Sequence, residues 1–192
     1  MPVYLALFRG INVSGHNMIK MEALKKLMEA EGYNNVETYI QSGNVVFEHE
    51  EANRDKIAKD LEILMYKEYG HNVVIFILQE ADLAQIIDNN PYAKREPEGQ
   101  GVKKLFVAFL NGKPTEAGKD QLKKYNRGDD VFKVIENALY LKLATSAADS
   151  KLTNVFIENK MNIKATTRNW NTTIKMLEML ESRNIKGIKD LN

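Results

Sequence analysis

The residues most able to do chemistry lie in three short polar segments. Residues 9–17 carry an arginine, a histidine, two asparagines and two glycines directly after the apolar run Val3–Phe8. Residues 41–44 form a Gln-Ser-Gly-Asn turn, and residues 166–172 surround one arginine with threonines and asparagines. Guanidinium and amide groups bind anions and polar ligand edges. We therefore expect a ligand site built from Arg9, Asn12, Asn17, Gln41, Ser42, Asn44, Arg168, Asn169 and Asn171.

Gly10 and Gly15 have the spacing of a G-x-x-x-x-G phosphate loop. That motif continues with lysine and then serine or threonine, whereas this chain has His16 and Asn17, so we exclude a nucleotide triphosphatase of this class. Backbone N–H groups together with Arg9 can still hold a phosphate or carboxylate. The alternative is a structural loop whose asparagines bond to their own backbone.

Apolar periodicity predicts the order βαββαβ twice, with one extra helix after each copy. This pattern indicates an α+β protein with two ferredoxin-like subdomains and a C-terminal helix. The expected strands cover residues 3–8, 36–40, 45–47, 73–78, 105–110, 131–135, 138–143 and 161–166. Trp170 and Leu177 are in phase on the last helix, which we expect to open within 166–172.

A run rich in proline, glycine and charge separates the two copies. We expect a first subdomain at 1–90, a linker at 91–102, and a second subdomain with the C-terminal helix at 103–192. A right-handed crossover makes the first two strands parallel, so both end at one edge of the sheet. Segments 9–17 and 41–44 should therefore lie side by side. Arg168 joins them only if the last helix packs against the first subdomain.

The net charge of +1 hides an asymmetry, because residues 1–90 carry −6 and residues 91–192 carry +7. A basic half can bind a polyanion, or the two halves can attract each other. The chain has no cysteine, which excludes disulfides and thiolate metal sites and fits a reducing compartment. We expect no signal peptide and no membrane partner, and a cytoplasmic location. The sequence does not define an oligomeric state.

The leading interpretation is a binding module for a small anionic or nucleotide-like ligand. An alternative is RNA binding through the basic second half, although Phe106 and Phe109 have a spacing that puts them on opposite faces of a strand. A second alternative is an enzyme that uses His16 or His71 as acid or base beside Arg9. No catalytic set is complete, so catalytic residues remain unknown, and we expect no cofactor. The three histidines share no metal-ligand spacing, so we expect no metal.

Three blocks carry a resemblance to a known family. They are residues 9–17, the run from Tyr39 to Phe47, and the run from Thr167 to Thr172. In that order they resemble the bacterial family called domain of unknown function 1697, over nearly the whole chain. The resemblance implies two ferredoxin-like subdomains, in agreement with the pattern above. It implies no activity.

Overall fold

The computed structural model describes residues 1–13, 15–93, 104–124, 129–144 and 146–189. Its contacts divide the chain into two compact units, Met1–Ala84 with Lys175–Asn192 and Gln85–Ile174. The expected linker at 91–102 lies outside the described residues from residue 94 onward. The bounds 1–90 and 103–192 stay a prediction, and the contacts group the last helix from Lys175 with the first unit.

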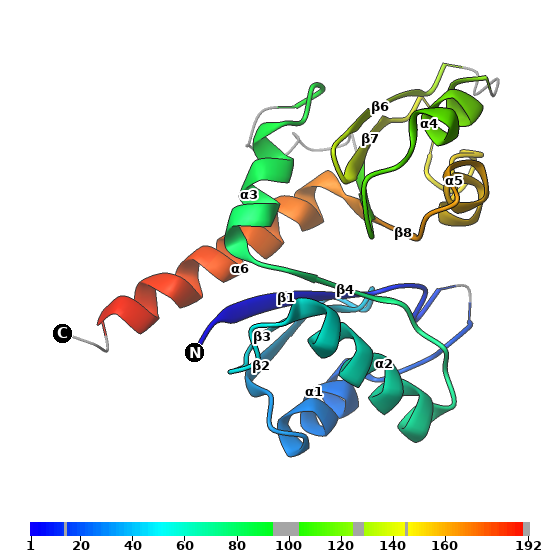
Figure 1. Cartoon of the computed structure of the whole chain (residues 1–192). Helices are drawn as coiled ribbons and strands as arrows, with labels where there is room; N and C mark the ends of the chain where they lie inside the picture. Colours follow the sequence, from blue (N-terminus) through cyan, green and yellow to red (C-terminus); the bar gives the residue numbers. More distant parts are fainter. Residues whose placement is uncertain (14, 94–103, 125–128, 145, 190–192) are drawn as a thin grey trace. The chain divides into compact units, whose positions relative to one another are not determined.

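The first unit contains the first βαββαβ copy. Its four-stranded antiparallel sheet has the order β2-β3-β1-β4, and α1 and α2 lie on one face of it (Figure 1). This is the order of a ferredoxin-like sheet, as predicted. The elements are β1 (Val3–Phe8), α1 (Met21–Ala30), β2 (Asn34–Tyr39), β3 (Asn44–Glu48), α2 (Arg54–Tyr69), β4 (Ile75–Leu78) and α3 (Glu80–Asp88), whose last turn belongs to the second unit.

The second unit repeats this topology with the sheet order β6-β7-β5-β8. Each pair of neighbouring strands is antiparallel. The fold class predicted from the sequence, two ferredoxin-like subdomains with extra helices, is confirmed. The elements are β5 (Leu105–Leu110), α4 (Glu116–Lys123), β6 (Val131–Ile135), β7 (Ala138–Lys142), α5 (Asn154–Met161), β8 (Ala165–Asn169) and α6 (Trp170–Lys189), which continues into the first unit.

The end of the second copy differs from the sequence-based prediction. The last strand was expected at 161–166 and the opening of the last helix within 166–172. Instead Met161 closes α5, Ala165–Asn169 forms β8, and the helix begins at Trp170. The β-branched Thr166 and Thr167 suit a strand, and β8 pairs with β5 along its whole length. A strand with so few apolar residues has no alternation that local reading can detect.

The first sheet is buried on both faces. Tyr4, Ala6 and Phe8 point into a core with residues of α1 and α2, while Leu5 and Leu7, which point the other way, are also fully buried. Arg183 of α6 forms ion pairs of 2.8 Å with Glu37 and 3.5 Å with Glu48. The second half of α6 therefore reaches the sheet face opposite α1 and α2.

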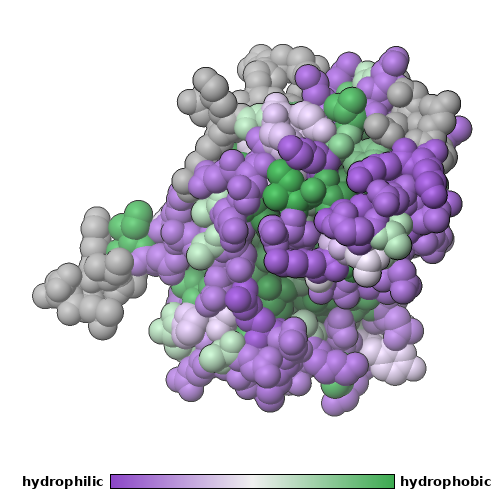
Figure 2. Space-filling view, turned by 45° about the horizontal axis from the view of Figure 1, so that its top comes forward, coloured by the Kyte–Doolittle hydropathy of each residue, from purple (hydrophilic) through white to green (hydrophobic). Residues whose placement is uncertain are grey.

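The second unit has its own core on the α4 and α5 side of its sheet. Leu122 of α4 and Ile157 of α5 pack there with Ala108 and Leu139. On the opposite face the Tyr140 hydroxyl donates a 2.7 Å hydrogen bond to the Ile86 carbonyl in α3. Hydrophilic side chains dominate the surface in Figure 2. None of the helices among the described residues has the length and apolar character that crossing a bilayer requires.

Candidate functional site

The polar segments of the first unit meet at one end of its sheet, as predicted from the parallel direction of β1 and β2. The Asn12 side chain donates a 2.8 Å hydrogen bond to the Gln41 carbonyl, which joins the loop after β1 to the turn after β2. The Arg9 N–H donates at 2.9 Å to the Val74 carbonyl, which brings in the chain entering β4. We call this meeting of residues 9–19, 40–44 and 72–74 the rim.

Gly43 lies where the turn after β2 contacts the end of β1 and the loop that follows it. Its carbonyl accepts a 2.8 Å hydrogen bond from the Phe8 N–H, and its φ is +75°. A Cβ at this position would lie 2.8 Å from side-chain carbons of both Ile11 and Phe8. Only glycine satisfies both the left-handed backbone and the close approach.

The loop of residues 9–19 is held by the side chains of its own asparagines. Asn12 Oδ1 accepts from the Ile19 N–H at 2.7 Å, and Asn12 Nδ2 donates to the Ile19 carbonyl at 2.9 Å. Asn17 Nδ2 donates to the Gly10 carbonyl at 3.1 Å. The backbone has a positive φ at Gly10, Asn12, Gly15 and Asn17. These bonds support a structural role for Asn12 and Asn17, the alternative that the sequence left open.

Asn44 has a similar structural role at the turn. It is 1% exposed, and its Nδ2 donates at 3.1 Å to the Tyr39 carbonyl and at 3.0 Å to the Ser42 hydroxyl. The Gln41 side chain is exposed, and Ser42 is half-buried. Of the turn residues, Gln41 therefore has the side chain best placed to meet a ligand from solvent.

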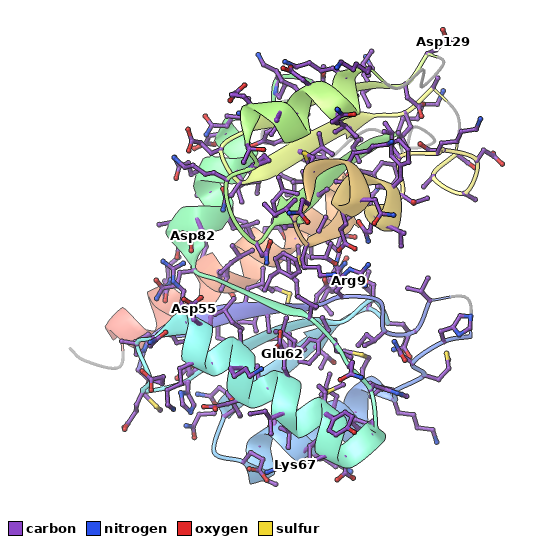
Figure 3. The ribbon with its side chains drawn as sticks, turned by 45° about the vertical axis from the view of Figure 1, so that its right-hand side comes forward. Arg9, Asp55, Glu62, Lys67, Asp82 and Asp129 are labelled. Carbon is purple, nitrogen blue, oxygen red and sulfur yellow. The ribbon has the colours of Figure 1, made fainter. Side chains whose placement is uncertain are left out.

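The start of the loop has two backbone donors for an anion, one at the half-buried Gly10 and one at Ile11, which is 1% exposed. Arg9 is half-buried and directly follows the last residue of β1 (Figure 3). Gly10 and Ile11 come next in the chain. Within the described part of the chain, the backbone N–H groups of Gly10 and Ile11 donate to no acceptor. Two successive N–H groups that directly follow an arginine in the chain are the elements of an anion-binding nest.

The remaining expected site residues belong to the second unit. Arg168 is 7% exposed, and its guanidinium donates to the Thr166 hydroxyl at 2.8 Å and to the Thr167 carbonyl at 3.0 Å. Burial lowers the pKa of Arg168 to about 10, so the side chain remains charged at neutral pH. Asn169 Oδ1 accepts from the Asn171 N–H at 2.9 Å, which is a helix-capping contact at the start of α6. Their combination with the rim into one site stays a prediction.

Two of the basic residues of the second unit are already engaged by acceptors of the same unit. Lys104 donates to a main-chain carbonyl at 2.7 Å, and Lys123 lies 3.1 Å from Asp120. Lys103 lies outside the described residues. Phe106 packs against the core, and Phe109 on the other face is 1% exposed. Two exposed aromatic rings on one face, which RNA-binding sheets of this kind use, are therefore not offered by this pair.

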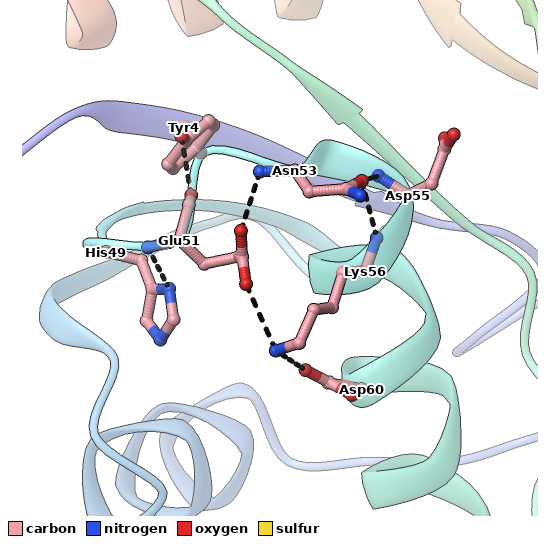
Figure 4. Close-up of polar contacts among 7 residues, drawn as sticks. All are labelled: Tyr4, His49, Glu51, Asn53, Asp55, Lys56 and Asp60. Atoms are coloured by element: carbon pink, nitrogen blue, oxygen red, sulfur yellow. Dashed lines mark hydrogen bonds and ion pairs between the residues drawn. The ribbon is translucent and has the colours of Figure 1, made fainter.

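A polar cluster at the start of α2, which the sequence analysis did not single out, includes the acidic residue Glu51. Glu51 accepts from the Asn53 N–H at 2.9 Å and lies 3.2 Å from Lys56, and these contacts lower the pKa of its carboxyl group (Figure 4). The Tyr4 hydroxyl donates to the Glu51 carbonyl at 2.8 Å. The Glu51 N–H donates to His49 Nδ1 at 3.1 Å, so this histidine stabilises the loop before α2.

The other two histidines lie apart from any metal set. His16 is exposed in the loop after β1, and His71 stacks on Tyr69 with ring centres 6.3 Å apart. Among the described residues, no three His, Cys, Asp or Glu side chains gather into a group that could hold a metal ion. The enzyme alternative stays a prediction without a matched nucleophile or metal.

The fold and the rim define a protein of two ferredoxin-like subdomains with a polar, loop-built edge on the first. The chain belongs to the family described as "Protein of unknown function (DUF1697)", which it matches over residues 1–140. The resemblance read from its motifs is thus confirmed, although the block at 167–172 lies beyond the matched residues. A comparison with curated proteins gives no match.

A solved structure supports the fold. It is described as that of the conserved bacterial protein SP0830 from Streptococcus pneumoniae, with a TM-score of 0.71 and 22% sequence identity. The alignment covers 93% of this chain and 98% of that one. At this identity the likeness speaks for the fold alone.

Proposed function

We propose that this protein is a binding module for a small anionic or nucleotide-like ligand, and that the rim of the first unit is its site. The observation that carries the proposal is the pair of adjacent N–H groups at Gly10 and Ile11, which have no acceptor in the described part of the chain and directly follow Arg9. A preformed group of donors favours an anion because little reorganisation is needed on binding.

In this proposal the rim residues have two kinds of role. Arg9 supplies charge, and the exposed Gln41 supplies an amide that can recognise a polar ligand edge. Asn12, Asn17 and Asn44 keep the backbone in place, since their amides are already bonded to main-chain carbonyls. The cysteine-free composition suits a reducing compartment, and we propose a cytoplasmic location.

A thermal-shift screen with inorganic phosphate, pyrophosphate, nucleotides and small carboxylates tests the proposal. A ligand that binds only the native state raises the melting temperature, and the shift grows with the logarithm of the ligand concentration once that concentration exceeds Kd. We expect a hit that is lost in Arg9→Ala and kept in Lys26→Ala, which removes an exposed cation from α1. Equal shifts in both variants, or no shift with any of these anions, would remove the rim from consideration.

A further inference from the structure

A groove runs along the first unit between α2 and the chain that enters β4. It has a volume of about 500 Å³, within the usual range of ligand and peptide pockets. Ile63 and Tyr66 of α2 are 42% and 59% exposed, so its helix wall presents apolar surface to water. The lining residues are Lys59, Glu62, Ile63, Tyr66, Lys67, Asn72, Val73 and Val74.

The other wall of the groove continues into the edge of the sheet. β4 is an edge strand, and the Val74 carbonyl faces β1, where it accepts from Arg9. Alternation then turns the backbone groups of Ile75 and Ile77 away from the sheet. Within the described part of the chain, the N–H and C=O of Ile77 have no hydrogen-bond partner. An edge of this kind is a template for another strand.

One backbone donor on this edge already has an acceptor from outside the sheet. Glu62 Oε1 accepts a 3.2 Å hydrogen bond from the Ile75 N–H. The carboxylate oxygen lies where the carbonyl of an added strand would lie. The contact shows that the Ile75 N–H can be reached from the groove, and it engages the one acidic side chain of the lining.

The charges of the groove match an acidic chain. Lys59 and Lys67 are exposed on α2, eight residues and therefore about 12 Å apart along the helix. Figure 3 labels Glu62 and Lys67 on this helix. Side chains four residues apart on an extended peptide share a face and are separated by about 13 Å. Two acidic residues at that spacing can therefore reach both lysines.

We propose that the groove between α2 and β4 binds an extended peptide segment with acidic side chains, which adds a strand to the edge of β4. The peptide places an apolar side chain against Ile63 and Tyr66, and its carbonyl takes over the Ile75 N–H from Glu62. Main-chain hydrogen bonds then provide affinity, and the groove provides selectivity. The groove shares residues 72–74 with the rim, but it uses none of the proposed anion contacts at Arg9, Gly10, Ile11 and Gln41.

Selection of random peptides displayed on phage against the full chain tests the proposal. We expect enriched peptides with Asp or Glu four residues apart, and fluorescence polarisation then measures their binding. Changing both Lys59 and Lys67 to Glu should weaken binding about tenfold, because two attractive charges become repulsive. The matched control Lys26→Glu, on α1, should leave binding unchanged. Glu62→Ala should tighten binding about threefold, because the Ile75 N–H no longer has a competing acceptor.

Each alternative outcome overturns the proposal. Selection that enriches no peptide would do so, as would peptides that bind the double lysine variant and the unchanged chain equally. Amide NMR shifts on binding should cluster at residues 59–67 and 73–77. Shifts confined to residues 9–19 would assign the peptide to the rim instead. Melting curves of every variant without peptide separate lost binding from lost folding.

Discussion

The two units have the same strand order and differ in the connections at corresponding positions. In the first unit twelve residues, 9–20, join β1 to α1, whereas five residues, 111–115, join β5 to α4. The short connection is held by Asn111, whose side chain accepts from the Lys164 N–H at 3.0 Å. The fold itself therefore needs only a short loop here. Because loops longer than the fold requires often carry function, we look for the site in the loop of residues 9–20.

The hairpin turn is likewise longer in the first unit than in the second. Glu136 and Asn137 connect β6 to β7, while residues 40–43 connect β2 to β3. Glu136 has a φ of +51° and Ile40 one of +50°, but only Ile40 is β-branched, and it is 49% exposed. The first unit thus has a more unfavourable residue at this position than the second, which fits a region shaped by more than stability.

The largest effect should come from filling the space at Gly43. Gly43→Ala places a Cβ 2.8 Å from Ile11 and Phe8 in a left-handed backbone, and we expect a loss of about 3 kcal/mol in the free energy of unfolding. Gly70→Ala is the matched control, because its φ is +68° but no atom lies within 4 Å. It should cost about 1 kcal/mol. Equal losses by urea denaturation would show that the close packing of the rim contributes nothing.

Removing Asn12 should have the next largest effect. Asn12→Ala removes the bonds to both backbone groups of Ile19 and to the Gln41 carbonyl, and we expect a loss of about 2 kcal/mol. Asn111→Ala in the second unit removes one exposed bond and should cost about 1 kcal/mol or less. Urea denaturation measures both, and a larger loss for Asn111→Ala would reverse the comparison between the loops.

Alkaline unfolding should involve one tyrosine in each unit. Burial raises the pKa of Tyr33 and of Tyr140 to about 12 from the ordinary value of 10. Because the folded protein keeps these phenol protons longer than the unfolded chain, their contribution to stability is complete below pH 10 and is lost as pH rises towards 12.

Phenylalanine substitutions separate the two tyrosines. Tyr33→Phe should leave stability at neutral pH within about 0.5 kcal/mol and reduce the alkaline loss. Tyr140→Phe should reduce the alkaline loss in the same way. Unlike Tyr33→Phe, it should lower the free energy of unfolding at neutral pH by about 1 kcal/mol, because the bond to the Ile86 carbonyl is removed. Denaturation series from pH 7 to 12 measure both effects, and an unchanged alkaline slope in both variants would contradict these assignments.

The smallest expected effect is a gain in stability. Ile40→Asn replaces a β-branched residue at positive φ with one that tolerates this backbone, and should add about 1 kcal/mol. Glu136→Asn should add less, because Glu136 lacks a branched Cβ and pairs with Lys113. Thermal unfolding measures both changes. A loss of stability in Ile40→Asn would mean that the exposed isoleucine makes contacts that support the fold.

The sequence predicted the elements whose signals are local. Alternation and helical spacing predicted the two βαββαβ copies. The caps of α2, Asn53 and Gly70, are of residue types that favour helix ends. The meeting of the loop with the turn at 41–44 followed from the hand of one crossover. These predictions needed only residue order and backbone geometry.

What the sequence could not give depends on partners far along the chain. The polar strand β8 is recognisable only through its pairing with β5. The inward direction of the Asn12 and Asn44 side chains depends on which carbonyls the folded turn presents. An asparagine that binds a ligand cannot be distinguished by sequence from an asparagine that stabilises a loop. The site residues were therefore predicted as a group, without their separate roles.

The central claim is that the longer connections of the first unit form an anion site that the second unit lacks. A ¹⁵N amide NMR titration of the full chain with pyrophosphate and ATP tests it in one spectrum. Saturable shifts should appear at Gly10, Ile11 and Gly43 while residues 111–115 and 136–137 stay unchanged, and Arg9→Ala should abolish them. Shifts centred on the second unit, or identical titrations of Arg9→Ala and the unchanged chain, would contradict the claim.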